Sequence, residues 1–367
     1  MKVVQVCKYR NDTVEGVDLF EEVIRAAQGH DRSFYIFHGE AGNLGERLGC
    51  DTVSFRFSKS DIKRIRPSAV LKVLRQLRHD KPDVIITHRM KPSVFVAWCG
   101  LFLPGVRKIS VVHNMEEFKK PRRRFFARLL MRDWKFAACS EAVRQDMLLR
   151  GFSPEEVVAI PNSVNEQIVR NNLLDREQAR RDLGVPVEAQ RVIGTVGRMR
   201  PVKGHKYLID AMRQMDNPPH VVVIGDGELL EEMRASARQY GLEDRLIFAG
   251  GRNNAYRYAS AFDAFIMPSL REGLPIAMLE AIAAGVPGYG TPVGGIPEIL
   301  RDQRWLFEKE STEAVKKVLE YLGSASDEQL AETRGEQYQV FKKSFSIESY
   351  HARFRSLMEG GDGRVEG

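Results

Sequence analysis

The sequence predicts an α/β protein of two doubly wound domains, each a parallel sheet with helices on both faces. Short runs of β-branched residues alternate with segments of helical periodicity along nearly the whole chain. A turn-rich break near residue 160 separates two such series, and 367 residues suit two domains. Ligands of such sheets bind beyond the carboxyl ends of the strands, so we expect a site in a cleft where the domains face each other.

The first series begins with an apolar run at residues 3–7, too short and too quickly followed by Lys8 and Arg10 to be a signal peptide. Residues 18–27 have helical spacing through Leu19, Val23 and Ile24. The remaining predicted elements of this series are strands at 34–37, 84–87, 109–112 and 136–139, and an amphipathic helix at 70–77.

The break at residues 160–165 reads Ile-Pro-Asn-Ser-Val-Asn, and a second series follows it. Asp175 and Gln178 predict a capping box, and Gly184 the end of that short helix. Strands are expected at 192–196, 221–224, 246–248 and 264–267, and helices at 205–215, 228–240, 276–284 and 347–358. We therefore expect domains at 1–165 and 166–343, a helix at 344–359 that packs back on the first domain, and a disordered tail at 360–367.

Composition excludes several classes of protein. Hydrophobic residues make up 43% and charged residues 29%, as in ordinary globular proteins. The longest apolar stretch, about residues 94–106, is too short to span a membrane and contains Gly100 and Pro104. The four cysteines are far apart without a C-x-x-C, which argues against a zinc ribbon or redox motif. We expect a cytoplasmic protein.

Positive charge is concentrated in the first half of the chain. Residues 1–165 hold 29 Lys and Arg against 19 Asp and Glu. Residues 119–135 alone contain eight Lys and Arg with one acid, Asp133, and predict a helix with an apolar stripe of Phe125, Phe126, Leu129, Leu130 and Trp134. Its basic face suits the anionic inner surface of a membrane; the alternative is a crossover helix with an ordinary solvated face. Without a recognised motif beside the charge, nucleic acid is not expected as a partner.

Familiar catalytic and nucleotide motifs are missing. Gly225-Asp226-Gly227 follows a predicted strand, but Leu230 stands where a dinucleotide fingerprint needs its third glycine, so a tight turn is the better interpretation. The chain has no Walker A loop, no G-x-S-x-G and no H-E-x-x-H. It also has no D-x-D pair to hold a metal diphosphate.

Two loops carry the interpretable chemistry. In Gly197–Gly204, Arg198 leaves a strand and Lys203 lies near a helix start, where both charges can meet a diphosphate. A solvated charged loop is the alternative. In residues 268–281, Glu272 precedes a helix that Pro275 would open, and Glu280 lies two turns inside it. Helix capping by Glu272 and a solvated position for Glu280 are the alternatives there.

Together these segments resemble the family 4 glycosyltransferases, retaining nucleotide-sugar enzymes of the GT-B fold. The resemblance is strong over residues 191–300. It rests on G-R-x-x-x-x-K-G at 197–204, E-x7-E at 272–280, Ser140-Glu141, Ile160-Pro161-Asn162 and A-I-A-A-G-V-P at 281–287. The first domain matches in outline only: Gly16 is the only glycine in the loop after the first strand, where the family often has paired glycines.

The resemblance implies roles for particular residues. Arg198 and Lys203 would bind the donor diphosphate and stabilise the charge that develops as it leaves, Glu272 would hold hydroxyls of the donor sugar, and Glu280 would accept from the ribose. His113 would lie near the donor sugar; a satisfied histidine at a strand end is the alternative. The remaining implied contacts are Gly250 and Arg252 at the base, and backbone N–H groups around Gly273, Leu274, Pro275 and Ile276 at the phosphates.

The implied reaction is a retaining transfer that needs neither metal nor cofactor, because Arg, Lys and a helix terminus would meet the leaving charge. The donor would be a UDP-sugar, with a GDP-sugar second. The acceptor would be a glycan or lipid-linked glycan, such as a lipopolysaccharide-core or cell-surface polysaccharide intermediate. The alternatives are a nucleotide-sugar epimerase or phosphorylase of the same fold, and a non-catalytic scaffold at the membrane surface.

Overall fold

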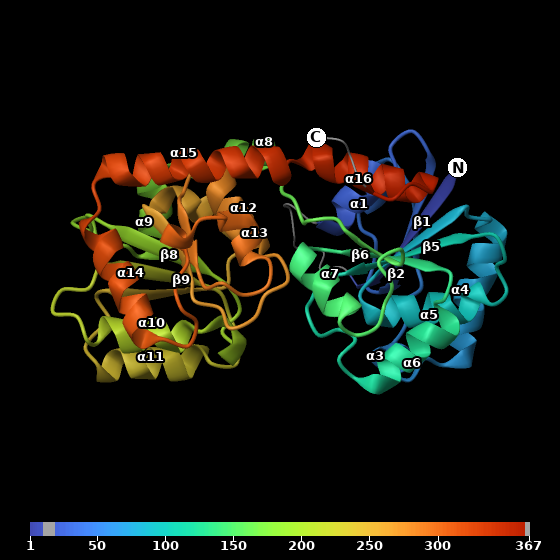
Figure 1. Ribbon diagram of the computed structural model, residues 1–367, viewed down its shortest axis with the longest axis horizontal. Coiled ribbons are helices and arrows are strands. Elements are labelled where there is room, and N and C mark those ends of the chain that lie inside the picture. Colours follow the sequence, from blue (N-terminus) through green and yellow to red (C-terminus); the bar gives the residue numbers. More distant parts are fainter. Residues whose placement is uncertain (10–18, 364–367) are drawn as a thin grey trace. The chain divides into compact units, whose positions relative to one another are not determined.

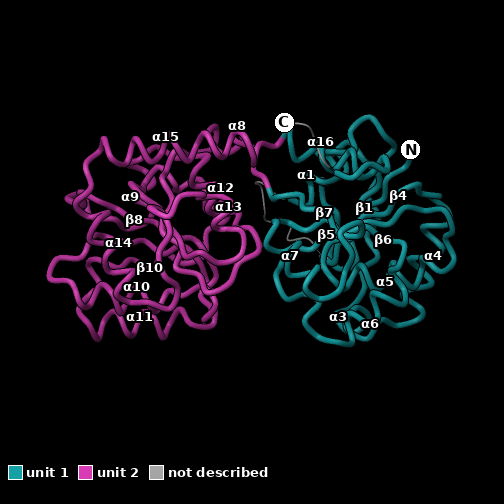
Figure 2. Tube along the Cα trace, viewed as in Figure 1, with its two compact units in different colours: residues 1–14, 18–162, 348–367 teal, residues 15–17, 163–347 magenta. Residues whose placement is uncertain are grey.

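The computed structural model describes residues 1–9 and 19–363 and divides into two compact units (Figure 2). Unit 1 comprises the described residues up to Asn162 and the C-terminal segment from Glu348; unit 2 comprises Ser163–Ile347. These divisions fall within a few residues of the predicted boundaries at 165 and 343. No helix among the described residues is both long and apolar enough to span a membrane.

Unit 1 is built on one parallel sheet of order β3-β2-β1-β4-β5-β6-β7. Its strands are β1 (Lys2–Tyr9), β2 (Asp31–His38), β3 (Asp51–Ser54), β4 (Val84–His88), β5 (Arg107–Val112), β6 (Trp134–Ala138) and β7 (Val157–Ala159). Its helices are α1 (Leu19–Ala26), α2 (Leu44–Leu48), α3 (Lys59–Arg64), α4 (Pro67–Asp80), α5 (Met90–Gly100), α6 (Pro121–Leu130), α7 (Glu141–Leu148) and α16 (Ile347–Glu359). Figure 1 shows α1 and α16 on one face of this sheet and α4 and α5 on the other.

Unit 2 has a parallel sheet of order β10-β9-β8-β11-β12. Its strands are β8 (Val192–Val196), β9 (His220–Ile224), β10 (Leu246–Gly250), β11 (Ala264–Met267) and β12 (Gly288–Gly290). Its α-helices are α8 (Glu166–Asn171), α9 (Arg176–Leu183), α10 (His205–Met212), α11 (Leu230–Gln239), α12 (Ile276–Ala283), α13 (Ile296–Leu300), α14 (Thr312–Ser324) and α15 (Asp327–Ser344). Three 3₁₀ turns complete it: η1 (Pro201–Lys203), η2 (Ala255–Ala261) and η3 (Gln303–Trp305).

Continuous apolar runs became the strands buried on both faces. Every residue of β4 and of β9 is buried, which is why these segments lack the alternation of a half-exposed strand. In both sheets the order reverses direction beside the first strand, β1 or β8, so helices cover both faces. The carboxyl ends of the strands thus lie along one edge of each sheet, and the loops after them carry the candidate residues.

The predicted basic helix at 119–135 is wrong in extent and in its stripe. Helix α6 ends at Leu130, and Trp134 is buried at the start of β6, where it pairs with the neighbouring strand β5. Phe125 and Leu129, two members of the predicted apolar stripe, are 70% and 61% exposed. The outer face of α6 is therefore both basic and apolar.

Two terminal features also differ from the sequence prediction. Asp175 caps α9 by accepting from the N–H groups of Glu177 and Gln178, but the Gln178 side chain donates to Asp182 instead of closing a capping box. Residues 360–363 of the predicted disordered tail are placed, with the Gly361 N–H donating to the Ser356 carbonyl. Residues 364–367 and the predicted helix start at Asp18 lie outside the described residues, as does Gly16.

Helix α16 packs against unit 1 through named contacts. The His351 Nε2 atom lies 2.8 Å from the Glu22 carboxylate, and Arg355 donates to the Ala26 carbonyl at 3.3 Å. Arg107 of β5 donates to the Met358 carbonyl near the end of α16. These contacts join the C-terminal helix to α1 and to the sheet of the same unit.

Candidate functional site

The loops after β8 and β11 touch through backbone at a glycine. Gly204 has φ +68°, and a Cβ atom there would lie 1.9 Å from the Pro268 carbonyl oxygen, so only glycine fits. The Leu270 N–H donates to the Val202 carbonyl at 2.8 Å beside it. The two sequence motifs, separated by some 70 residues, are thereby held against each other at the carboxyl edge of the unit 2 sheet.

An ion pair joins these two loops. The Lys203 Nζ atom lies 2.7 Å from Oε1 of Glu272, and the Ser269 hydroxyl donates to the same oxygen at 2.6 Å. Among the described residues, no hydrogen bond is made to the other carboxylate oxygen, Oε2. Glu272 does not cap α12, so the capping alternative for this residue is wrong. Its second oxygen is left to accept hydrogen bonds from a ligand.

Arg198 follows β8 and is exposed. Within residues 1–9 and 19–363 its guanidinium forms no hydrogen bond and no ion pair. Five donors with fixed geometry therefore remain for an anion such as a diphosphate. Arg252, after β10, is also exposed and makes no such contact in the described part of the chain.

Helix α12 begins without a side-chain cap. Pro275 is its N-cap residue, one position before the predicted helical start, and the first turn contains no acid. The first N–H groups of the helix, from Ile276 onward, are thus available to an anion. Gly294 packs over this segment: its φ is +54°, and a Cβ atom would lie 2.1 Å from the Glu272 carbonyl oxygen. The Gly295 N–H donates to the Gly273 carbonyl at 2.7 Å, whereas Leu274 is buried.

Glu280 is a poorly solvated carboxyl inside α12. Burial raises the pKa of Glu280 to about 8, and its side chain has no hydrogen-bond partner among the described residues. Burial raises the pKa of the Tyr256 hydroxyl, and the charge of the nearby Glu280 raises it further. The alternative of an ordinary solvated mid-helix glutamate is wrong for Glu280. A carboxyl of this kind is suited to accept hydrogen bonds from a bound ligand.

The loops after β9 and β10 contribute glycines to the same edge. A Cβ atom on Gly225 would lie 2.0 Å from the Gly197 carbonyl oxygen, and one on Gly227 would lie 2.4 Å from the Met199 carbonyl oxygen. Such a close approach is expected of a tight turn. Gly250 ends β10 with φ +72°, and a Cβ on the next glycine, Gly251, would lie 2.1 Å from an Asp226 carboxylate oxygen. Four successive loops of unit 2 are therefore close-packed through glycines.

His113 belongs to unit 1, where it follows β5. Its Nε2 atom lies 3.1 Å from Nδ1 of His88, the last residue of β4. Burial, followed by the charge of Arg89, lowers the pKa of His113 to about 3. The histidine is thus neutral at physiological pH.

Sequence reasoning missed three residues of these loops. Ser269 was not singled out, although it stands three residues before Glu272 and bonds to it. Thr291 was also missed; its hydroxyl donates to the Ser269 carbonyl. His205 is buried beside Gly197, and burial with the charge of Lys203 lowers the pKa of His205 to about 4. A signal was present for Ser269, which lies two residues after the predicted strand at 264–267, and for His205, which begins a predicted helix. Thr291 follows β12, a strand that the sequence did not predict.

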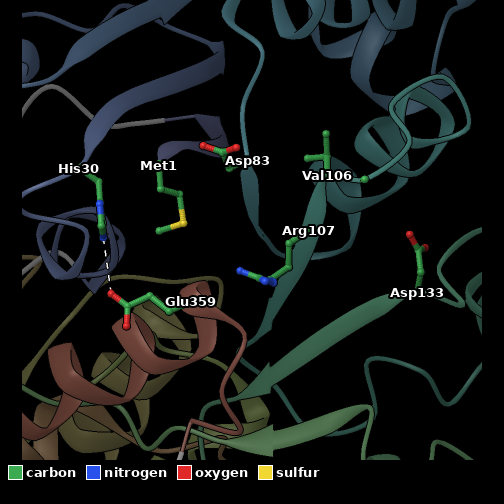
Figure 3. Close-up of a pocket in the computed structure, with 8 residues that line it drawn as sticks. Met1, His30, Asp83, Val106, Arg107, Asp133 and Glu359 are labelled. Carbon is green, nitrogen blue, oxygen red and sulfur yellow. Dashed lines mark ion pairs between the residues drawn. The ribbon is translucent and has the colours of Figure 1, made fainter.

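An open pocket of about 820 Å³ lies at the edge of the unit 1 sheet formed by the amino ends of its strands, opposite the carboxyl ends (Figure 3). Met1, Asp83 and Arg107 line it at the amino ends of strands, together with the ion pair between His30 and Glu359 at 3.7 Å. Ligands of doubly wound sheets bind at the carboxyl ends, so this pocket is not the candidate site. No cluster of three or more His, Cys, Asp or Glu that could hold a metal ion occurs among the described residues.

Two family descriptions match the chain. Residues 23–168 match the family described as Glycosyltransferase Family 4, and residues 175–339 match the one described as Glycosyl transferases group 1. The second range contains Arg198, Lys203, Glu272 and Glu280. The first contains His113.

Curated relatives match over part of their length. A UDP-Gal:α-D-GlcNAc-diphosphoundecaprenol α-1,3-galactosyltransferase of Escherichia coli is 27% identical over 62% of this chain and 62% of that protein. The lipopolysaccharide core biosynthesis glycosyltransferase LpsD of Rhizobium meliloti is 38% identical over 32% of this chain and 34% of that protein. The chain spans from about one third to about two thirds of the length of the curated relatives that it matches.

The fold is shared with solved structures over nearly the whole chain. Anabaena HepE, crystallised with UDP and glucose, is 19% identical and superposes with a TM-score of 0.82, covering 98% of this chain and 99% of that one. At this identity the likeness concerns the fold.

Proposed function

The chain belongs to the family 4 glycosyltransferases and has the GT-B fold, and on this premise we propose that it transfers a sugar from a nucleotide-sugar donor to a glycan or lipid-linked glycan. We further propose a UDP-sugar as donor and retention of configuration at the anomeric carbon. The acceptor class would be a lipopolysaccharide-core or cell-surface polysaccharide intermediate. One observation carries the proposal: Lys203 and Glu272, from the two motif loops, meet at 2.7 Å.

The proposed roles follow from the chemistry of these side chains. A departing nucleoside diphosphate gains negative charge, and Arg198, Lys203 and the uncapped start of α12 can stabilise it without a metal ion. Glu272 would accept from donor-sugar hydroxyls through its unoccupied Oε2. Glu280 would accept from ribose hydroxyls, which favour its ionised form. No separate general base is required if the leaving phosphate takes the acceptor proton.

The choice of UDP is supported by relatives. The E. coli relative is described as using UDP-Gal, and HepE was crystallised with UDP. The loop that would contact the base contains Gly250 and Arg252, and its exposed guanidinium suits the carbonyl oxygens of a pyrimidine.

The experiment begins with donor selection. Thermal shifts of the full chain with UDP-, GDP- and ADP-sugars should show stabilisation by the true donor, about 2.7 kcal/mol at 100 times its Kd. Product analysis after incubation with that donor and a lipid-linked glycan should then show a lengthened glycan and free UDP. An epimerised donor or a sugar phosphate would indicate the epimerase or phosphorylase instead. Donor binding without any turnover would contradict enzyme function.

We also propose that unit 1 contacts the anionic cytoplasmic face of a membrane through one surface, the basic apolar face. Its apolar members are exposed side chains of α4, of α5 with the two residues after it, and of α6. They are Leu71, Trp98, Leu101, Phe102, Phe125 and Leu129. The Trp98 ring lies 6.4 Å from Phe126, and the Arg78 guanidinium lies 5.8 Å from the Phe102 ring, so the three helices form one surface.

The charge of this face suits anionic lipid headgroups. Arg122, Arg128 and Arg132 are exposed beside Phe125 and Leu129. Arg128 and Arg132 line an open cavity of about 480 Å³, together with Arg124, Gly151 and Phe152. Asp133, the one acid of residues 119–135, is bound to Lys108. Arginines around exposed aromatic and leucine side chains are the composition of a surface that inserts at a lipid interface. A lipid-linked acceptor would be reached at such a surface.

A further inference from the structure

Two neighbouring parallel strands of unit 1 end on histidines that bond to each other. His88 closes β4, and His113 follows β5 immediately, with His88 paired to Val111 in the strand register. The His88 Nδ1 atom lies 3.1 Å from the His113 Nε2 atom. The Phe20 ring packs on both imidazoles, at centroid distances of 4.5 and 5.3 Å. The pair is therefore held in a fixed geometry by its strands and by an aromatic contact.

The space between the two rings holds one proton. Burial lowers the pKa of both imidazoles far below 7, and the guanidinium of Arg89 nearby acts in the same direction. Each ring is thus neutral and carries one N–H. A hydrogen bond between two facing nitrogens needs one donor and one acceptor, so either His88 Nδ1 or His113 Nε2 bears the proton.

The surroundings of the other ring nitrogen of His88, Nε2, distinguish between these two arrangements. Its Nε2 atom is buried and has no hydrogen-bond partner. If His113 donated, His88 would have to carry its proton on Nε2, where a buried N–H would remain unpaired. If His88 donates from Nδ1, only a lone pair on Nε2 is unpaired, and unpaired buried donors are the rarer and costlier of the two. The favoured arrangement is His88 Nδ1–H donating to His113 Nε2.

The tautomer of His113 follows from this assignment. With Nε2 accepting, His113 carries its proton on Nδ1. That atom makes no hydrogen bond among the described residues and is not one of the buried unpartnered atoms, so it reaches the surface. We infer that His88 is a positioning residue. It holds His113 in the neutral tautomer with the proton on Nδ1, so that this N–H can donate a hydrogen bond to an oxygen of the donor sugar. This rests on the proposed function and on the place near the donor sugar that the family resemblance implies for His113.

The inference restricts what His113 can do in the reaction. A neutral imidazole whose basic nitrogen already accepts a hydrogen bond does not serve as a general base. It contributes a hydrogen bond to a sugar oxygen, which orients the donor. His88 contributes only through His113, without touching substrate.

The tautomer is measurable without any turnover. Two-bond ¹H–¹⁵N correlation spectra of the full chain labelled with ¹⁵N-histidine distinguish protonated from unprotonated ring nitrogens. The chain has eight histidines, and variants His113→Gln and His88→Asn assign the two signals. We expect protonated Nδ1 and unprotonated Nε2 for His113. A protonated Nε2 on His113 at pH 7 would overturn the inference and leave the proposed glycosyl transfer untouched.

Substitutions of His88 supply the kinetic test. His88→Asn keeps an N–H donor near the position of Nδ1, and we expect turnover within about threefold of wild type. His88→Leu removes the donor, and kcat should fall by about tenfold with little change in donor KM. His220→Asn and His220→Leu are the controls, because His220 is a buried histidine at the amino end of β9, away from the candidate residues.

The outcomes are separable. Wild-type turnover in His88→Leu, or equal losses in the Leu and Asn variants, would overturn the positioning role. If His88→Leu does not fold, the Asn variant and the tautomer measurement still decide the matter. Absence of any sugar transfer by the wild-type chain would remove the proposed function, whereas the tautomer of His113 would stand as measured.

Discussion

Lys203 and Glu272 are 69 residues apart in sequence, yet Nζ of the lysine lies 2.7 Å from Oε1 of the glutamate. The contact uses one lysine proton and one carboxylate oxygen. Two lysine N–H groups and Oε2 of the glutamate remain for ligands. The pair is mostly buried, with side-chain exposures of 24% and 10%.

Glu272→Gln should lower turnover more than nucleotide binding. The amide is similar in size but lacks the charge that would hold donor-sugar hydroxyls, and we expect kcat to fall by at least ~10²-fold with a modest change in UDP affinity. Lys203→Ala should weaken the binding of both the donor and UDP, because it would remove the proposed contact of Lys203 with a phosphate. The double variant should lose less than the product of the two single losses. Measured kcat and UDP Kd of the three variants provide the check.

Glu313→Gln is the matched control, since Glu313 forms an exposed ion pair with Lys317 in α14 of the same unit. Wild-type turnover in both Glu272→Gln and Lys203→Ala, with folding intact, would place the chemistry elsewhere.

The raised pKa of Glu280 predicts that the stability of the folded state depends on pH. Its folded pKa of about 8 exceeds the ordinary value of 4.5, so the folded state binds the proton more tightly than the unfolded state does. That contribution to stability is complete below about pH 4.5 and is lost as pH rises toward 8, at no more than about 1.36 kcal/mol per pH unit. Denaturant titrations from pH 5 to 8 should show a shallower decline for Glu280→Gln than for wild type.

The same carboxyl should couple nucleotide binding to protons. In the proposed function, ribose hydroxyls would donate to the ionised form of Glu280, so UDP binding should release a proton from this carboxyl near pH 7. Calorimetry in two buffers of different ionisation enthalpy would count that proton, and Glu280→Gln should release one fewer. Equal proton release by the variant would contradict the ribose contact.

Chelation should leave turnover largely unchanged. In the proposed function, Arg198 and Lys203 would supply the positive charge that a metal would otherwise bring to the leaving diphosphate. Initial rates with EDTA, compared with rates after adding Mg²⁺ or Mn²⁺, give the answer. A strict requirement for either ion would count against this assignment of charge stabilisation.

The basic apolar face predicts binding to anionic vesicles, and the chain carries its own probe. Trp98 is 42% exposed, whereas the other two tryptophans, Trp134 and Trp305, are buried. Vesicles containing phosphatidylglycerol should therefore shift Trp98 emission to the blue, and brominated lipid should quench it. Replacing Arg122, Arg128 and Arg132 with Ser should weaken binding by about 1 kcal/mol per residue and leave UDP binding unchanged.

Two controls isolate this face. Arg238, Lys309 and Lys343 are exposed in unit 2, and their replacement with Ser removes the same charge elsewhere. Leu129→Ser removes an apolar side chain from the basic apolar face. Leu149→Ser is its control, since Leu149 is exposed in unit 1 outside the face. No emission shift for the wild-type chain at low salt would end the membrane proposal.

Much of the architecture was predictable from local pattern. Residues 192–196 and 264–267 were predicted as the strands that became β8 and β11, because their buried runs are short and β-branched or aromatic. Helix α5 was missed: it is apolar on nearly every side, so its sequence shows no helical period. Strand β12, Gly-Tyr-Gly, was missed because three residues with two glycines carry almost no strand signal.

The sequence by itself determined the residue types of the site and their order: Arg198, Lys203, Glu272 and Glu280 stand in motifs that local pattern places after strands. Tertiary structure decided how these residues interact. Burial inside α12 sets the pKa of Glu280, and the register of β4 with β5 brings His88 to His113. Sheet pairing joins residues far apart in sequence, and solvation depends on all the neighbours that packing supplies. Neither quantity is a property of a short segment, so only the folded chain could fix them.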